Sequence, residues 1–141
     1  MRKGLLKKAF PSDSKAMKSM EKAERFLRTA QMNMNARAYD GSVIMAYLAV
    51  FNAARSVLIR DGFRERSHAC ISRYLEKHYV PGKLKREHIM LLDRYRNLRH
   101  SDQYDVSFYA DERDASSMIG FAVELISEIK RILADRRIIT R

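Results

Sequence analysis

The run "GSVIMAYLAVFNAA" (residues 41–54) decides the fold, because it is the longest uncharged stretch in the chain. A membrane span needs about 20 consecutive apolar residues, so a run of this length predicts a buried helix and not a membrane anchor. Apolar side chains continue to Arg60 on nearly every side of a helix, which is typical of a helix at the centre of a domain. Asp61 and Gly62 then end the pattern, because glycine accepts the left-handed conformation that closes many helices. We therefore expect a central helix over residues 39–60.

Four further helices are expected on either side of this one along the chain. Apolar residues recur at spacings of three and four through long stretches, while the two prolines and five glycines fall at few places. Ser12, Asp13 and Ser14 offer helix N-caps near the start, and Ser67 offers another. The expected helices cover about residues 13–36, 39–60, 67–79, 83–102 and 111–136. The sequence thus predicts an all-α fold, an up-and-down helical bundle of about five helices.

Composition and charge indicate one domain with a basic surface. With 141 residues, of which 46% are hydrophobic and 32% charged, the chain is long enough for one core and too short for two ordinary domains. We expect a basic N-terminal segment (1–12), a single helical domain (13–136) and a basic C-terminal tail (137–141). Lys and Arg number 28 against 17 Asp and Glu, and the net charge of +11 favours a polyanionic partner or an acidic protein partner.

The first ten residues, "MRKGLLKKAF", have the basic start of a signal peptide, but Lys7 and Lys8 interrupt their apolar stretch. No hydrophobic region of export length follows, so we expect a cytoplasmic protein with no membrane contact. Cys70 is the single cysteine, which excludes an intramolecular disulfide and is typical of a small core residue.

A second stretch, "RYRNLRHSDQY" (residues 94–104), carries the candidate functional residues. It places three arginines and a histidine within seven positions of the fourth expected helix. Arg96 and His100 are four residues apart, so they can face one substrate together, and Tyr104 joins them if the helix persists that far.

The helical pattern predicts that this polar cluster points away from the core of its own chain. At about 100° per residue, Asp93, Arg96 and His100 lie nearly opposite the apolar stripe, and Ile89 falls on the same outward face. An apolar residue beside a polar cluster indicates a face that another chain covers. The predicted inner stripe comprises Leu84, His88, Leu91, Tyr95 and Leu98.

Three segments together resemble the HEPN family, and in particular its small stand-alone prokaryotic members. They are "AYLAVFNAARSVLIRDGF" (46–63), "SHACISRYLEKHYV" (67–80) and "LRHSDQYD" (98–105), in the order that family shows. The resemblance spans about residues 16–133. It implies an up-and-down helical bundle that often dimerises and frequently has a minimal nucleotidyltransferase as its partner. In many members it also implies RNA cleavage without metal.

The resemblance leaves two arrangements of the arginine and histidine residues open. Nuclease members carry an Arg followed, after four to six intervening residues, by a His, and Arg94 with His100 meets that spacing. Tyr95, however, stands where those members usually have a polar residue. Arg99 and Tyr104 instead match a Leu-Arg-x-x-x-x-Tyr form, whose members often lack the nuclease histidine.

Two functions therefore follow as hypotheses, and the sequence leaves open whether the protein is an enzyme. The first is a module that binds RNA or nucleotide phosphates, or docks on a nucleotidyltransferase, in a toxin–antitoxin-like, stress or defence system. The alternative is a metal-independent endoribonuclease toxin at a homodimer interface, because histidine titrates near neutral pH and arginine stabilises phosphoryl charge. The candidate phosphate-binding residues are Arg94, Arg96, Arg99, His68 and Tyr47. The candidate catalytic residues are His100 as base, Arg96 or Arg94 as phosphate clamp, and Tyr104 as an orienting group.

We expect neither a metal nor a cofactor. His68, Cys70, His78 and His88 match no paired zinc-ligand spacing, and His88 lies on the predicted inner stripe, where a hydrogen-bonded core histidine is expected. The five scattered glycines form no phosphate-binding loop.

Overall fold

The computed structural model describes residues 6–102 and 109–135, without the side chains of 99–102. It confirms the all-α helical bundle, and each expected helix is present with its ends within a few residues of the prediction. The helices are α1 (Asp13–Asn35), α2 (Tyr39–Asp61), α3 (His68–Tyr79), α4 (Arg86–Asp102) and α5 (Glu112–Ala134).

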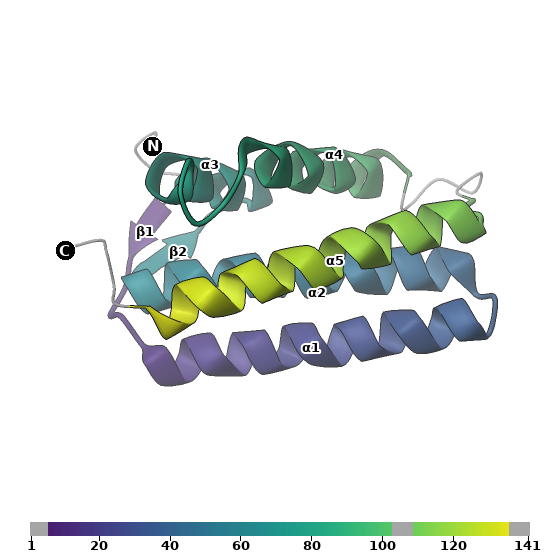
Figure 1. Cartoon of the computed structure of the whole chain (residues 1–141). Coiled ribbons are helices and arrows are strands. Elements are labelled where there is room, and N and C mark those ends of the chain that lie inside the picture. Colours follow the sequence, from purple (N-terminus) through teal and green to yellow (C-terminus); the bar gives the residue numbers. More distant parts are fainter. Residues whose placement is uncertain (1–5, 103–108, 136–141) are drawn as a thin grey trace.

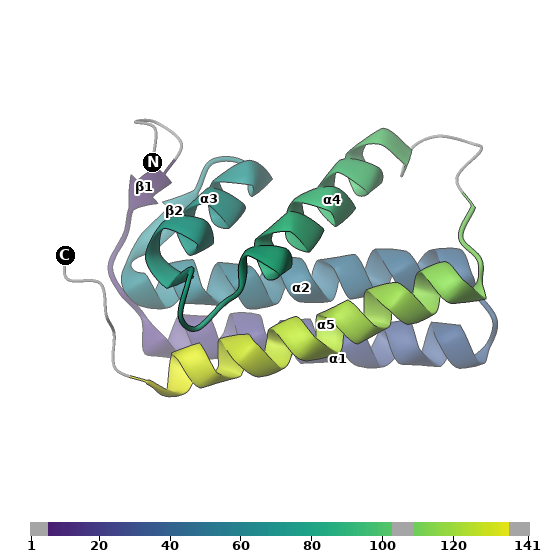
Figure 2. The same ribbon diagram turned by 45° about the horizontal axis from the view of Figure 1, so that its top comes forward.

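The long helices α1, α2 and α5 run side by side, and α3 and α4 lie over α2 on the side away from α1 (Figures 1 and 2). Helix α2 is apolar and long enough to cross a membrane, but 67% of its apolar window is buried inside the protein, as the prediction of a central helix requires. Gly62 ends α2 with φ at 90°, in the left-handed conformation that the sequence predicts.

Small residues let α1 approach α2 closely. Ala16, Ala23 and Ala30 are seven residues apart, so they fall on one side of α1, and all three are buried. The hydroxyl of Ser42 in α2 donates a hydrogen bond of 2.8 Å to the carbonyl of Ala30. This contact joins the two helices near the turn that connects them.

A two-stranded sheet closes one end of the bundle, which the purely helical prediction missed. Strand β1 (Leu6–Lys8) pairs antiparallel with β2 (Phe63–Glu65), so that Lys7 lies opposite Arg64. Leu6 and Phe63 pack against the helical core. The strands thus flank the α1–α2 hairpin, one before α1 and one after α2 (Figure 1).

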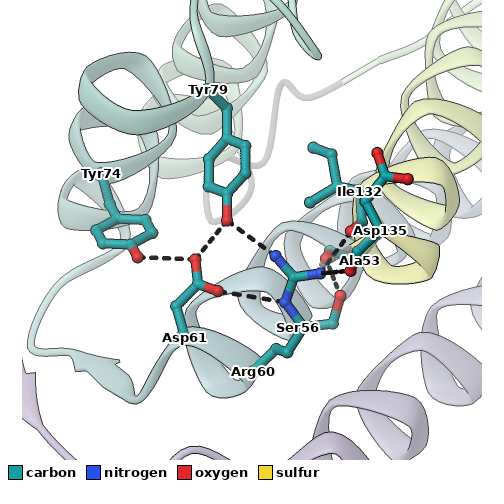
Figure 3. A network of polar contacts seen from close by, with 8 residues as sticks. All are labelled: Ala53, Ser56, Arg60, Asp61, Tyr74, Tyr79, Ile132 and Asp135. Carbon is teal, nitrogen blue, oxygen red and sulfur yellow. Dashed lines mark hydrogen bonds and ion pairs between the residues drawn. The ribbon is translucent and has the colours of Figure 1, made fainter. Parts of the chain in front are cut away.

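A buried polar network ties the end of α2 to α3 and α5 (Figure 3). The Asp61 carboxylate accepts hydrogen bonds from the hydroxyls of Tyr74 and Tyr79, at 2.8 and 2.5 Å. The guanidinium of Arg60 contacts the same carboxylate at 3.2 Å and also donates to the carbonyl of Ile132 in α5. Burial, together with the hydrogen bonds to Asp61, raises the pKa of both tyrosines far above its ordinary value.

Candidate functional site

Helix α4 buries two faces, because it lies between α5 on one side and α2 and α3 on the other. Tyr95 stacks on Phe121 of α5 at a ring distance of 5.6 Å, and burial raises the pKa of its hydroxyl. Ile89 and Leu92 are buried on the other side, with Ile89 only 2% exposed. The prediction that Ile89 faces outward is therefore wrong, since a single stripe does not describe a helix with two packed faces. Leu98, which we expected inside, is exposed.

Arg96 turns toward the protein, whereas the helical pattern predicted that it points away. Its side chain is 22% exposed, and its Nε atom is buried without a hydrogen-bond partner among the described residues. Its Nη2 atom donates to the Asp93 carboxylate one helical turn earlier, at 3.3 Å. The second packed face of α4 accounts for this orientation, because Arg96 follows Ile89 and Leu92 along that face.

Arg96 borders a small hollow between α2, α3 and α4, which we name the α2–α4 hollow. It encloses about 10 Å³, which is roughly the room that one water molecule needs. The hollow is lined by Tyr47, Phe51, Ala54, His68, Ile71, Ser72, Leu92 and Arg96. The structure therefore brings together Tyr47, His68 and Arg96, which come from three different helices.

Two polar atoms at the α2–α4 hollow lack partners within the described part of the chain. Besides Nε of Arg96, the Oγ atom of the buried Ser72 has none. An unpartnered buried polar atom costs about 1–3 kcal/mol, so both atoms gain from a water or a ligand oxygen that enters the hollow. Ser72 is absent from the predicted site residues, although its place four residues after His68 on α3 puts both on one helix face.

Aromatic and basic side chains continue from this hollow along α2. The hydroxyl of Tyr47 lies 3.5 Å from Nδ1 of His68, and the His68 ring contacts Phe51 edge-on at 4.0 Å. The guanidinium of Arg55 lies over the Phe51 ring at 4.4 Å and pairs with Glu65 of β2. Tyr47, Phe51 and Arg55 are four residues apart on α2, and this spacing was the available signal for Phe51 and Arg55, which the prediction omitted.

A network of charges holds Arg96 in place. Asp93 binds both Arg96 and, at 2.5 Å, Arg73 of α3. Glu76 contacts Arg73 at 3.7 Å and Arg86 at 3.5 Å. The network has one more guanidinium than carboxylates, so the neighbourhood of the α2–α4 hollow keeps a positive charge.

The other predicted site residues do not line the α2–α4 hollow within the described structure. Arg94 is exposed and lies on a different side of α4 from Arg96. His100 and Arg99 belong to α4, but their side chains lie outside the described residues, and Tyr104 lies outside them entirely. The backbone of α4 is helical through position 100, so this position shares a helix face with Arg96.

His88 is a core histidine, as predicted. Its Nδ1 atom accepts a hydrogen bond from the backbone N–H of Lys85 at 3.1 Å, and its Nε2 atom lies 3.3 Å from the carboxylate of Glu124. Among the described residues, no three His, Cys, Asp or Glu side chains form a group that could hold a metal ion. Ser67 is the N-cap residue of α3, as expected, but its side chain makes no capping hydrogen bond and contacts Cys70 instead.

Comparison with known proteins identifies the class. The family model described as "HEPN domain" matches residues 16–132, which is most of the chain, and the chain therefore belongs to the HEPN domain family. The crystal structure of an archaeal HEPN homologue has the same fold, with a TM-score of 0.63 at 22% identity over 84% of this chain and 97% of that one.

Two proteins of Methanocaldococcus jannaschii are similar along nearly their whole length. The one named "Putative toxin MJ0605" is 25% identical over 134 residues, which cover 94% of this chain and 98% of that protein. The one named "Putative toxin MJ0142" is 20% identical over 123 residues, which cover 86% and 84%.

Proposed function

We propose that this HEPN protein has a toxin-like role in which it binds the phosphate groups of RNA or of a nucleotide at the α2–α4 hollow. The observation that carries the proposal is the buried, unpartnered Nε atom of Arg96 beside the unpartnered hydroxyl of Ser72. A phosphate oxygen satisfies both donors, and guanidinium–phosphate hydrogen bonds are among the strongest in proteins. The names of the two archaeal relatives support the toxin-like role.

The charge of the chain supports a phosphate ligand independently. A net charge of +11 attracts nucleic acid over a long range, and each phosphate contact releases counterions. Tyr47 and His68 add a hydroxyl and an imidazole at the same hollow, where they orient a bound group. A minimal nucleotidyltransferase, which the family resemblance implies as a partner, would then act in the same cytoplasmic toxin–antitoxin-like system.

The test compares Arg96→Gln with Arg28→Gln, which removes one exposed charge from α1, a helix that contributes no residue to the lining of the hollow. Binding of labelled RNA and of ATP is measured by fluorescence anisotropy and calorimetry. Loss of a charge-assisted hydrogen bond of about 1.5–3 kcal/mol should weaken binding by Arg96→Gln about 10- to 100-fold. Arg28→Gln should change it less than about threefold. If the two variants weaken binding equally, the α2–α4 hollow is not the phosphate-binding site and the proposal is wrong.

A second candidate function is metal-independent RNA cleavage at a homodimer interface. The helical register of α4 favours it, because position 100 shares a face with Arg96. In this reaction His100 takes the proton of the 2′-hydroxyl, and the 2′-oxygen attacks the phosphorus to form a 2′,3′-cyclic phosphate as the bond from phosphorus to the 5′-oxygen breaks. Arg96 or Arg94 stabilises the phosphoryl charge, and Tyr104 orients the leaving 5′-oxygen, which takes up a proton from water.

Cleavage of mixed RNA in EDTA by the parent, His100→Ala and Arg94→Gln tests this second function. Loss of cleavage in His100→Ala, with unchanged circular dichroism, supports it, and light scattering reports whether the active species is a dimer. If Arg94→Gln also abolishes cleavage, the clamp is the arginine on the exposed side of α4. If the parent protein binds RNA but does not cut it, the cleavage function is wrong and only the binding function remains.

A further inference from the structure

A larger hollow lies where the two-stranded sheet meets the start of α1 and the end of α2, and we name it the basic hollow. Its volume is about 760 Å³, far larger than that of the α2–α4 hollow. Its lining includes Lys8, Phe10, Lys15, Arg55, Arg64 and Glu65. Four cationic side chains therefore surround it against one carboxylate.

Most of this positive charge is unpaired within the described structure. Arg55 is bound by Glu65 at 3.0 Å, but Lys8, Lys15 and Arg64 are exposed and have no ion-pair partner among the described residues. The register of the sheet adds a further repulsion, because Lys7 lies directly opposite Arg64. Like charges in facing positions destabilise a strand pair, and an anion bound to Arg64 in the basic hollow lowers that cost.

Phe10 gives the basic hollow an aromatic surface. Its side chain is 93% exposed, more than that of any other large apolar residue described. Exposed aromatic rings beside cations are the arrangement on which single-stranded nucleic acids stack their bases while their phosphates meet Lys and Arg. An acidic protein surface would use the cations but leave the ring without a matching partner.

The two hollows share a wall. Arg55 lines the basic hollow and covers Phe51, and Phe51 lines the α2–α4 hollow and contacts His68. One stack of side chains therefore separates them. A mononucleotide bound through a phosphate oxygen at the α2–α4 hollow would leave the basic hollow empty, because the α2–α4 hollow itself has room for about one oxygen atom. A strand of several nucleotides has further phosphates and bases to place in the basic hollow.

We propose that a single-stranded polynucleotide binds along both hollows, with phosphates on Lys8, Lys15 and Arg64 and a base on Phe10. The path continues across Arg55 to Arg96. The basic hollow then selects for an extended strand over a free nucleotide. The part of the path that reaches Arg96 rests on the function proposed for the α2–α4 hollow.

The experiment measures binding of a labelled oligonucleotide of about 12 nucleotides, as RNA and as DNA, and of AMP. The variants are Lys8→Ala/Arg64→Ala, Phe10→Leu and the matched control Arg25→Ala/Arg28→Ala, which removes the same charge from the exposed side of α1. Loss of two phosphate contacts should lower the salt dependence of the oligonucleotide affinity by about 1.4 in the log–log slope. Phe10→Leu should weaken oligonucleotide binding about tenfold, and none of these variants should change AMP binding.

The outcomes separate this inference from the function on which it rests. If Lys8→Ala/Arg64→Ala leaves the oligonucleotide affinity and its salt slope unchanged, the basic hollow does not bind a strand and the inference is overturned. An acidic protein surface would then be the better match for its cations. An equal loss in the Arg25→Ala/Arg28→Ala control would overturn it as well, because the effect would then be general charge. If Arg96→Gln alone has no effect, the proposed function fails while the basic hollow stands.

Discussion

Asp61→Asn should destabilise the protein strongly, because it removes a fully buried charge and keeps the shape of the side chain. The Asp61 carboxylate is 0% exposed and is the counterion of Arg60, which is 4% exposed. It also accepts the hydroxyls of Tyr74 and Tyr79. The substitution leaves the Arg60 guanidinium buried without a negative partner.

The expected loss is about 3–5 kcal/mol in the free energy of unfolding, the usual cost of breaking a buried ion pair on one side. For a chain of this size such a loss lowers the melting temperature by about 10 °C or more. Asp93→Asn is the matched control, since Asp93 is also paired with arginines but its side chain is 24% exposed. A pair of that exposure contributes only about 0–1 kcal/mol.

Urea unfolding followed by far-ultraviolet circular dichroism measures both variants. The midpoint of Asp61→Asn should fall while the denaturant slope stays that of the parent, since the folded state keeps its buried surface. If Asp61→Asn costs no more than Asp93→Asn, the buried network does not carry the stability assigned to it.

Three other perturbations test separate features of the structure. The pKa values of Tyr74 and Tyr79 are raised in the folded protein, so above the ordinary value of 10.0 the unfolded chain loses these protons first. The contribution of the two tyrosines to stability is therefore complete below that pH, and above it the free energy of unfolding should fall by up to about 1.4 kcal/mol per pH unit for each tyrosine. Denaturant titrations at alkaline pH measure the fall, and a flat profile would contradict it. Gly62→Ala should cost about 1 kcal/mol in the free energy of unfolding, because φ is positive there. Gly120→Ala should stabilise the protein by about 0.5–1 kcal/mol, because this residue lies inside α5 and no atom lies within 4 Å of the added carbon. The two variants should therefore shift the melting temperature in opposite directions. Ile89→Ala should cost about 2–5 kcal/mol in chemical unfolding, while a loss near zero would restore the outward orientation that the helical pattern predicts.

The number and limits of the helices could be predicted because their signals are local. Gly62 ends α2 and Asp111 caps α5 with a 2.8 Å bond to the Asp114 N–H, and such contacts depend on residues close in sequence. The strand pair could not be predicted in this way. Each strand is only three residues long, and the partners of Leu6 and Lys7 lie beyond two complete helices.

The candidate site was predicted in part. Tyr47, His68 and Arg96 are among the predicted phosphate-binding residues, and the fold brings them to one hollow. The helical pattern, however, predicts the wrong side of α4 for Arg96. The error is physical: one turn of α4 contacts α5 through Tyr95, and the adjacent face contacts α2 and α3, so hydrophobic spacing alone reveals only one of the two contacts. The available signal for Ser72 is its place four residues after His68 on α3, and that spacing does not reveal that its hydroxyl is buried without a partner among the described residues.

The pairing of β1 with β2 has a consequence for the order in which the protein folds. Helices α1 and α2 have 23 residues each and run antiparallel, so the chain returns to the level at which it began. If the strands paired before α1 and α2 packed together, closing the long loop between them would cost chain entropy, and the short strands would form few contacts to offset that cost. Once the α1–α2 hairpin has formed, the two strands already lie close together. The strand pair should therefore form after the transition state, and substitutions in Leu6–Lys8 should speed unfolding without slowing folding.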